Sequence, residues 1–112
     1  MVSLFKALGE ENRLRIINLL LDKQLCVCEI ESILSLTQTN VSRHLSKLKS
    51  ENIVTSFKDA QWIYYKINPI FLKENEALVE YLKDNFKTNQ VFIDDSEKYK
   101  KLKDSGFSCR NI

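Results

Sequence analysis

Apolar residues recur every three or four positions along most of the chain, and this spacing predicts a mainly helical fold. Their positions are Leu4, Phe5 and Leu8; Leu14, Ile17, Leu20 and Leu21; Val27, Ile30, Ile33 and Leu34; Val41, Leu45 and Leu48; and Phe71, Leu78, Leu82 and Phe86. Gly9 ends the first predicted helix, residues 22–25 are expected to form a connection, and Thr37 is the predicted N-cap of the fourth helix. Asn68 is the predicted cap of the last helix in this series, with Pro69 in its first turn.

A β-hairpin is predicted between the fourth and fifth helices. Residues 53–57 and 62–67 are rich in β-branched and aromatic side chains, which favour strands. Residues 58–61 contain neither Asn-Gly nor Asp-Gly, so we expect a four-residue or irregular tip instead of a tight turn. The order of elements predicts a winged helix-turn-helix with flanking helices, which is a mainly α fold with a β-hairpin wing.

The chain has 112 residues, 44% hydrophobic and 29% charged, which indicates one small domain. We expect residues 1–88 to form the winged helix-turn-helix and dimerisation domain, and residues 89–112 to form a polar C-terminal tail with a short helix near 94–104. A chain of this size buries only about two-thirds of its unfolded surface, so the apolar face of the fifth helix is expected to form a homodimer. The longest apolar stretch, residues 16–21, is too short for a membrane span, and the first residues lack a signal-peptide pattern. These features predict a cytoplasmic protein.

Positive charge is concentrated in one segment, although the net charge is only +2. Residues 36–50 contain Arg43, Lys47, Lys49 and His44 but no acidic residue. A local basic face of this kind is typical of an element that contacts phosphates, and the alternative is an ordinary solvated helix face.

Three segments carry a family resemblance. They are Leu-Cys-Val-Cys-Glu-Ile at 25–30, Gln-Thr-Asn-Val-Ser-Arg-His-Leu-Ser-Lys-Leu at 38–48, and Gln-Trp-Ile-Tyr-Tyr-Lys-Ile-Asn-Pro at 61–69. In this order they resemble the ArsR/SmtB family of metal-sensing repressors, in its arsenic-responsive branch, and the resemblance covers residues 4–86. It implies a repressor that binds a double-stranded DNA operator and dissociates from it when an inducer binds.

The second helix of a helix-turn-helix lies in the major groove, so the outer side of the fourth predicted helix is the expected reading surface. Amide side chains suit adenine and the guanidinium of Arg43 suits guanine, whereas hydroxyl and basic side chains suit bases or phosphates. The resemblance implies that the wing tip contacts the DNA backbone or the minor groove. For His44 the alternative is local packing. The candidate DNA-binding residues are Gln38, Thr39, Asn40, Ser42, Arg43, His44, Lys47, Lys58 and Gln61. A two-fold dimer is expected to read an inverted repeat.

Cys26 and Cys28 form a Cys-x-Cys motif at the start of the third predicted helix. Positions i and i+2 of an α-helix point about 200° apart, so both sulfurs could reach one small ion only if the helix were distorted. Unwinding its first turn would move the recognition helix and lower the affinity for DNA. Thiolates favour a thiophilic ion, and the resemblance implies As(III) or Sb(III) held by three sulfurs.

The third sulfur is not apparent from the local sequence. Many arsenic-sensing members carry a cysteine three residues after the motif, where this chain has Glu31. Cys109 is the remaining candidate ligand, from its own or the partner subunit, and a buffer thiol is the alternative. Cd(II) or Pb(II) could bind the same sulfurs, and no metal is expected to be required for folding. Zn(II) sensing is disfavoured because the chain has one histidine and Asp84, Asp94 and Asp95 read as solvated surface.

Three other functions are alternatives to a metalloid-responsive repressor. A redox-responsive repressor would oxidise the same cysteines and respond to peroxide. A thiol enzyme such as an arsenate reductase fits poorly, because the chain has no glycine-rich anion loop and few predicted strands. A protein-interaction module would show no sequence-specific affinity for DNA.

Overall fold

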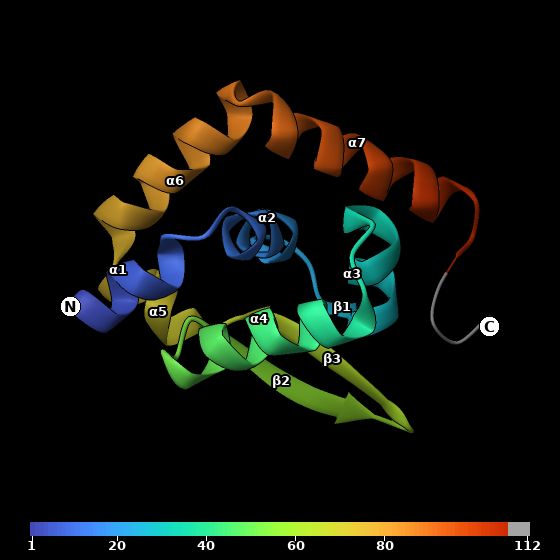
Figure 1. Cartoon of the computed structure of the whole chain (residues 1–112), viewed down its shortest axis with the longest axis horizontal. Coiled ribbons are helices and arrows are strands. Elements are labelled where there is room, and N and C mark those ends of the chain that lie inside the picture. The colour runs from blue at the N-terminus through green and yellow to red at the C-terminus, as the bar shows by residue number, and fades with distance from the viewer. Residues whose placement is uncertain (108–112) are drawn as a thin grey trace.

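The computed structural model describes residues 1–107. Its helices and strands follow the predicted order, except that a short strand β1 is added and the predicted fifth helix is divided into α5 and α6. In chain order they are α1 (Val2–Leu8), α2 (Glu11–Leu20), β1 (Leu25–Cys26), α3 (Val27–Leu34), α4 (Gln38–Ser50), β2 (Val54–Asp59), β3 (Trp62–Ile67), α5 (Pro69–Glu74), α6 (Glu76–Thr88) and α7 (Gln90–Asp104). Helix α2 lies at the centre, α6 and α7 arch over one side of it, and α4 lies with the hairpin on the other side (Figure 1). None of the helices within residues 1–107 combines the length and apolar character needed to cross a lipid bilayer.

Helices α3 and α4 form the predicted helix-turn-helix. Ser35 ends α3 in the left-handed region, with φ 56° and ψ 42°, which turns the chain sharply toward α4. The Thr37 hydroxyl then accepts a hydrogen bond from the Asn40 backbone N–H at 3.2 Å, so the predicted N-cap is confirmed. Val41, Leu45 and Leu48 are fully buried, as the periodicity of α4 predicted.

The sheet has a third strand that the sequence pattern did not reveal. The antiparallel order is β1-β3-β2, with Leu25 opposite Tyr65 and Cys26 opposite Tyr64. Residues 22–25 were expected to be only a connection. A two-residue strand is too short to show an alternating pattern, and its partner lies about forty residues later in the chain.

The wing tip is tighter than predicted. Asp59 pairs with Trp62, so only Ala60 and Gln61 form the turn, instead of four residues. Ala60 adopts φ 57°, a conformation that glycine would normally supply. The absence of Asn-Gly or Asp-Gly therefore marks a strained tight turn and not a longer loop.

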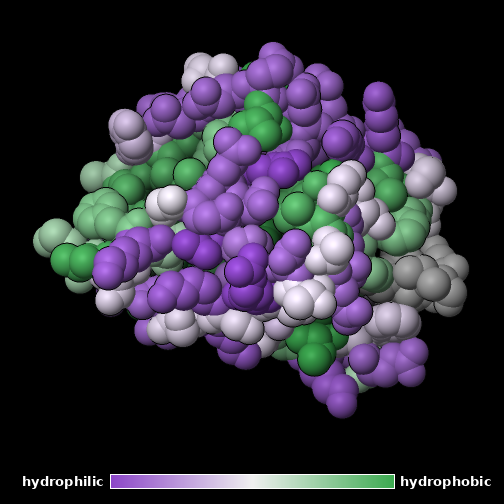
Figure 2. Space-filling model, in the orientation of Figure 1, coloured by the Kyte–Doolittle hydropathy of each residue, from purple (hydrophilic) through white to green (hydrophobic). Residues whose placement is uncertain are grey.

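The apolar face predicted for the fifth helix mostly serves the chain's own core. The helix is interrupted at Asn75, which separates α5 from α6. Phe71, Leu82 and Phe86 are buried within the chain, and the rings of Phe86 and Phe92 have centroids 4.6 Å apart. The large apolar residues that remain exposed include Met1, Val2, Phe5, Ile70 and Tyr81. Figure 2 shows apolar surface around the end of the molecule that carries α1.

Residues 90–104 form a long helix that packs on the core, where a polar tail with a short helix was expected. Phe92 and Asp95 of α7 are buried, and Asp95 is only 1% exposed. Both carboxylate oxygens of Asp95 accept hydrogen bonds from the Arg15 guanidinium of α2, at 2.8 and 2.9 Å. This hydrogen bonding also raises the pKa of Arg15. The interpretation of Asp95 as solvated surface is therefore wrong. The local sequence could not reveal this, because the partner of Asp95 lies eighty positions earlier in the chain.

Replacing Ala60 with glycine should increase the free energy of unfolding by about 1 kcal/mol, because glycine adopts positive φ without the steric cost that a Cβ imposes. Urea unfolding followed by circular dichroism measures the change. Lys58→Gly, in the extended part of β2, is the control and should lower stability instead. Destabilisation by Ala60→Gly would contradict the account of this turn.

Candidate DNA-reading face and thiol site

Helix α4 presents a polar outer face that is free of acidic residues in its first turn. The side chains of the predicted readers are exposed at Gln38, Thr39, Arg43 and Lys47, and half-buried at Asn40 and Ser42. Lys58 and Gln61 are exposed at the wing. Eight of the nine predicted DNA-binding residues therefore lie at the surface, on α4 and the hairpin that packs beside it.

Arg43 is partly ordered by its own helix. Its guanidinium Nη2 donates to the Asn40 side-chain oxygen at 3.3 Å, one turn earlier. The guanidinium and the amide thus stand side by side on the outer face of α4, where both forks can meet base edges.

His44 lies buried on the inner side of α4, which is the local packing that was the alternative to DNA contact. The residue is 5% exposed, and its Nδ1 lies 3.4 Å from Arg13 Nη1 and 3.5 Å from Glu10 Oε2. Burial lowers the pKa of His44 below its ordinary value of 6.5, and the Glu10 carboxylate offsets this only in part. Arg13 also donates from Nε to the Ala7 carbonyl at 2.6 Å, so these contacts join α4 to the start of α2.

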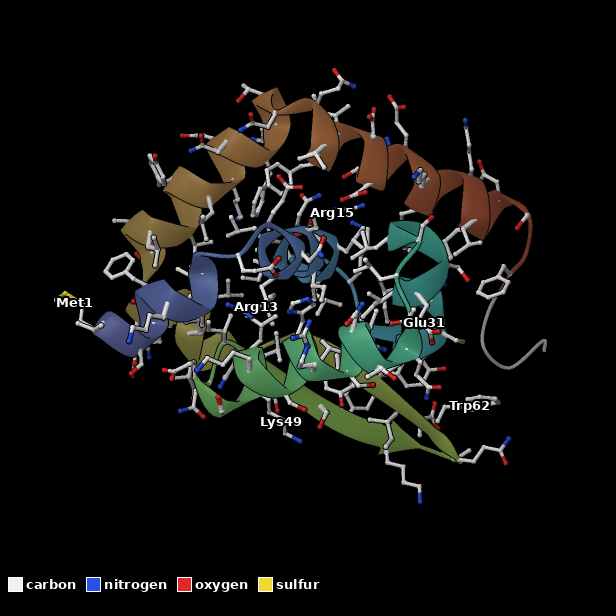
Figure 3. The ribbon with its side chains drawn as sticks, viewed as in Figure 1. Met1, Arg13, Arg15, Glu31, Lys49 and Trp62 are labelled. Atoms are coloured by element: carbon white, nitrogen blue, oxygen red, sulfur yellow. The ribbon has the colours of Figure 1, made fainter. Side chains whose placement is uncertain are left out.

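Lys49 connects the recognition helix to the wing, a role that the sequence analysis did not assign. Its ammonium donates to the Ser56 hydroxyl of β2 at 2.7 Å. Figure 3 shows Lys49 projecting from α4 on the side of the hairpin. The two elements that carry the predicted DNA-binding residues are thereby held to each other.

The two cysteine sulfurs lie close together without any distortion of α3. Cys26 precedes the helix as its N-cap, with extended backbone angles of φ −90° and ψ 167°, whereas Cys28 lies in the first turn. The expectation that ion binding must unwind α3 assumed that both residues are helical, and it is wrong for that reason. One extended residue brings the sulfurs to 3.5 Å from each other.

This separation suits two ligands of one ion. Two metal–thiolate bonds of about 2.3 Å place their sulfurs about 3.3 Å apart at a right angle and about 3.8 Å apart at the tetrahedral angle, and the observed separation falls between these values. Among residues 1–107, the structure contains no group of three or more His, Cys, Asp or Glu side chains that could hold a metal ion. Cys109, the predicted third ligand, lies outside the described residues.

A buried carboxylate supports the thiol pair, and the sequence analysis overlooked it. Glu29 is 2% exposed, and its Oε1 accepts hydrogen bonds from the Cys26 backbone N–H at 3.0 Å and from the Cys26 Sγ at 3.2 Å. Its Oε2 forms an ion pair with Lys103 of α7. The spacing Cys26-x-x-Glu29 is that of a capping box with cysteine in the place of serine, and this was the available signal.

The thiol pair and the DNA-reading face border the same hollow. This hollow has a volume of about 330 Å³, and its lining includes Cys26, Cys28, Glu31, Gln38, Gln61 and Trp62. Glu31 and Trp62 both appear at the end of the molecule where α3 approaches the hairpin (Figure 3). Side chains assigned to ion binding therefore adjoin two side chains assigned to DNA.

Comparisons with known proteins agree with this arrangement. Residues 10–56 match the family described as bacterial regulatory protein, arsR family. The chain is 39% identical over 66 residues to the arsenic resistance transcriptional regulator ArsR2 of Pseudomonas putida, covering 58% of this chain and 57% of that protein. It is 42% identical over 67 residues to the cadmium resistance transcriptional regulatory protein CadC of Listeria innocua, covering 59% and 56%. These alignments span little more than half the length of either relative.

A third relative aligns over more of its length. The transcriptional activator HlyU of Vibrio cholerae is 38% identical over 81 residues, which is 72% of each chain. A solved structure of HlyU superposes with a TM-score of 0.62, at 37% identity, over 72% of this chain and 88% of that one. The fold is that of a winged helix-turn-helix. The chain belongs to the arsR family of bacterial regulatory proteins.

The protein should lose stability as the pH falls below 6.5, in part because His44 is held neutral in the folded state. The lowered pKa means that the unfolded chain binds the proton more readily, so acid favours unfolding until the folded-state pKa is passed. Urea unfolding at pH 7.5, 6.5 and 5.5 should show a shallower pH dependence for His44→Gln than for the wild type. Equal slopes would contradict a buried neutral imidazole.

Proposed function

We propose that the protein is a transcriptional repressor that binds an inverted-repeat operator as a homodimer and dissociates when As(III) or Sb(III) binds its cysteines. The observation that carries this proposal is the shared hollow, where Cys26 and Cys28 adjoin Gln38 of the recognition helix and Gln61 of the wing. A ligand of the thiols would act directly beside two groups that face DNA. Such a protein would work in the cytoplasm, where its operator is accessible.

The coupling follows from the position of the thiols at the junction of β1 and α3. Cys26 belongs to a strand that pairs with β3 of the wing, and Cys28 belongs to the first helix of the helix-turn-helix. Fixing the two sulfurs on one ion fixes the wing against α3, and α4 follows α3 after a short turn. An ion that prefers the geometry of the DNA-free state lowers operator affinity, and DNA lowers ion affinity by the same factor.

Two thiolates leave a three-coordinate ion incomplete, and Cys109 is the ligand that we assign to the third position. Lys103, near the end of α7, contacts Glu29 beside Cys26, so this helix leads toward the thiol pair. Phe107 is the last described residue, and two further residues extend the chain by at most about 7 Å. Cys109 of the same subunit or the partner subunit's Cys109 would complete the set. Cd(II) and Pb(II) would use the same sulfurs.

Exposed apolar residues of α1, α5 and α6 support the dimer. Val2, Phe5, Ile70 and Tyr81 are each at least half exposed, although they are large apolar or aromatic side chains. Burying them against a second copy is favourable, and an isologous interface places two recognition helices for two half-sites.

Arg43→Ala should weaken specific DNA binding by about 1 to 3 kcal/mol, because it removes the guanidinium fork from the reading face. Lys47→Ala should weaken binding to all sequences more uniformly and reduce the salt dependence. Fluorescence anisotropy with a duplex selected from random DNA measures both effects. The control is Lys87→Ala, which changes an exposed lysine of α6. If both variants bound like this control, the reading face would be wrongly assigned.

Cys26→Ser and Cys28→Ser should each abolish release of DNA by arsenite, whereas the wild type should lose about 5- to 150-fold in operator affinity. Mobility-shift titrations with arsenite, antimonite, Cd(II), Pb(II) and peroxide separate an ion sensor from a redox-responsive repressor that uses the same sulfurs. Cys109→Ser tests the third ligand in parallel. Retained arsenite release in the Cys26/Cys28 double variant would refute the assignment of the sensing site, and unchanged release in Cys109→Ser would exclude that residue as a required ligand.

A further inference from the structure

Glu29 is a buried charged group for which the proposed function has no use. A carboxylate that is 2% exposed must be compensated by hydrogen bonds or by an opposite charge. Here both kinds of partner are present, and each comes from a different part of the fold. The thiol site supplies two donors through Cys26, and α7 supplies the ammonium group of Lys103.

The two oxygens of Glu29 are thus divided between the ion site and the last helix. Oε1 holds the backbone and the sulfur of Cys26, which are the features that bring Cys26 and Cys28 together. Oε2 faces Lys103, whose side chain is 36% exposed and also lies over the ring of Tyr99. One buried carboxylate therefore joins Cys26 to the C-terminal turn of α7.

We propose that Glu29 is a positioning residue of the thiol site, and that its ion pair with Lys103 couples occupancy of that site to α7. The inference rests on the proposed function, because it assumes that Cys26 is a ligand of a thiophilic ion. It adds Glu29, which does not touch the ion but holds the ligand Cys26 in place. It also adds α7 as the helix that responds to ion binding.

The coupling has a geometric origin. Cys26 Sγ lies 3.2 Å from Glu29 Oε1, so an ion held by this sulfur lies beside the carboxylate and constrains its position. The same carboxylate accepts the Cys26 N–H through Oε1 and pairs with Lys103 through Oε2, so a displacement of Glu29 is transmitted to the last turn of α7.

The position of Glu29 can affect α7 chiefly at the C-terminal turn of that helix. Asp95, a little more than two turns before Lys103, is anchored to Arg15 of α2 through two hydrogen bonds. The Asn18 amide donates to the Phe92 carbonyl at 3.2 Å, which holds the start of α7 as well. Because the first half of the helix is fixed, a stronger or weaker contact at Lys103 alters chiefly its C-terminal turn, from which the chain continues to Cys109.

The first test measures ion affinity by the ultraviolet charge-transfer absorbance that thiolates give with Cd(II), and by competition with arsenite. Glu29→Gln and Lys103→Met should each raise the dissociation constant about 10- to 100-fold, the usual effect of removing a group that orients a metal ligand. Glutamine at this position can still accept the Cys26 N–H, so the cap of α3 is kept. Lys103→Arg should restore near wild-type affinity, and Lys101→Met, an exposed lysine of the same turn, is the matched control.

The second test is amide hydrogen exchange with and without Cd(II). Exchange in the last turn of α7 should slow on ion binding in the wild type and in Lys103→Arg, and Lys103→Met should lose this slowing. Circular dichroism checks that each variant is folded. Because Lys103 is at the surface, its variants decide the matter even if Glu29→Gln does not fold.

The outcomes separate the two proposals. If the wild type gives no charge-transfer absorbance and does not bind arsenite, the proposed function fails and the role of Glu29 fails with it. If the wild type binds both ions but Glu29→Gln and Lys103→Met bind as tightly as Lys101→Met, only the positioning role is overturned. Ion binding that leaves α7 exchange unchanged in the wild type would overturn the coupling.

Discussion

Cys26 must satisfy two elements at the same time, and the arrangement of the helix-turn-helix depends on how it does so. It is the last residue of β1, where it pairs with Tyr64, and it is also the N-cap of α3. Its backbone consequently remains extended while the next residue is already helical. This single change of backbone conformation places both sulfurs on one side, attaches the wing to α3, and sets the direction from which α4 follows.

Among residues 1–107, two carboxylates are buried, and both connect α7 to earlier parts of the chain. Asp95 pairs with Arg15 of α2, and Glu29 of α3 pairs with Lys103. A buried ion pair contributes little net stability, but removing one partner is costly because the other charge remains buried. The two ion pairs therefore determine where α7 packs more than they add to the free energy of unfolding. Phe92 and the other apolar residues of α7 provide its hydrophobic contact with the core.

The recognition helix has polar contacts on both of its sides, which serve different purposes. Arg43 and Asn40 stand together on the outer side, where the hydrogen bond between them leaves further donors and acceptors for DNA. On the inner side His44 contacts Arg13 of α2 and Glu10, the N-cap of α2, in an otherwise apolar stripe. Since Lys49 also binds the wing, polar contacts with α2 and with β2 both determine the orientation of α4.

The sequence by itself determined the order of the main elements, the outer and inner sides of α4, and the Cys-x-Cys motif, because these depend on periodicity and spacing along the chain. The expectation that the two cysteine sulfurs point about 200° apart failed at Cys26, because the rotation of 100° per residue applies only to residues that are already helical. Only the tertiary structure decided that His44 faces inward, that Asp95 is buried, and that Glu29 links the thiols to α7. In each case the deciding partner is distant in sequence, at Arg13, Arg15 or Lys103. A polar residue within a helical pattern has the same local signature whether it meets water or a buried opposite charge, and only packing distinguishes the two.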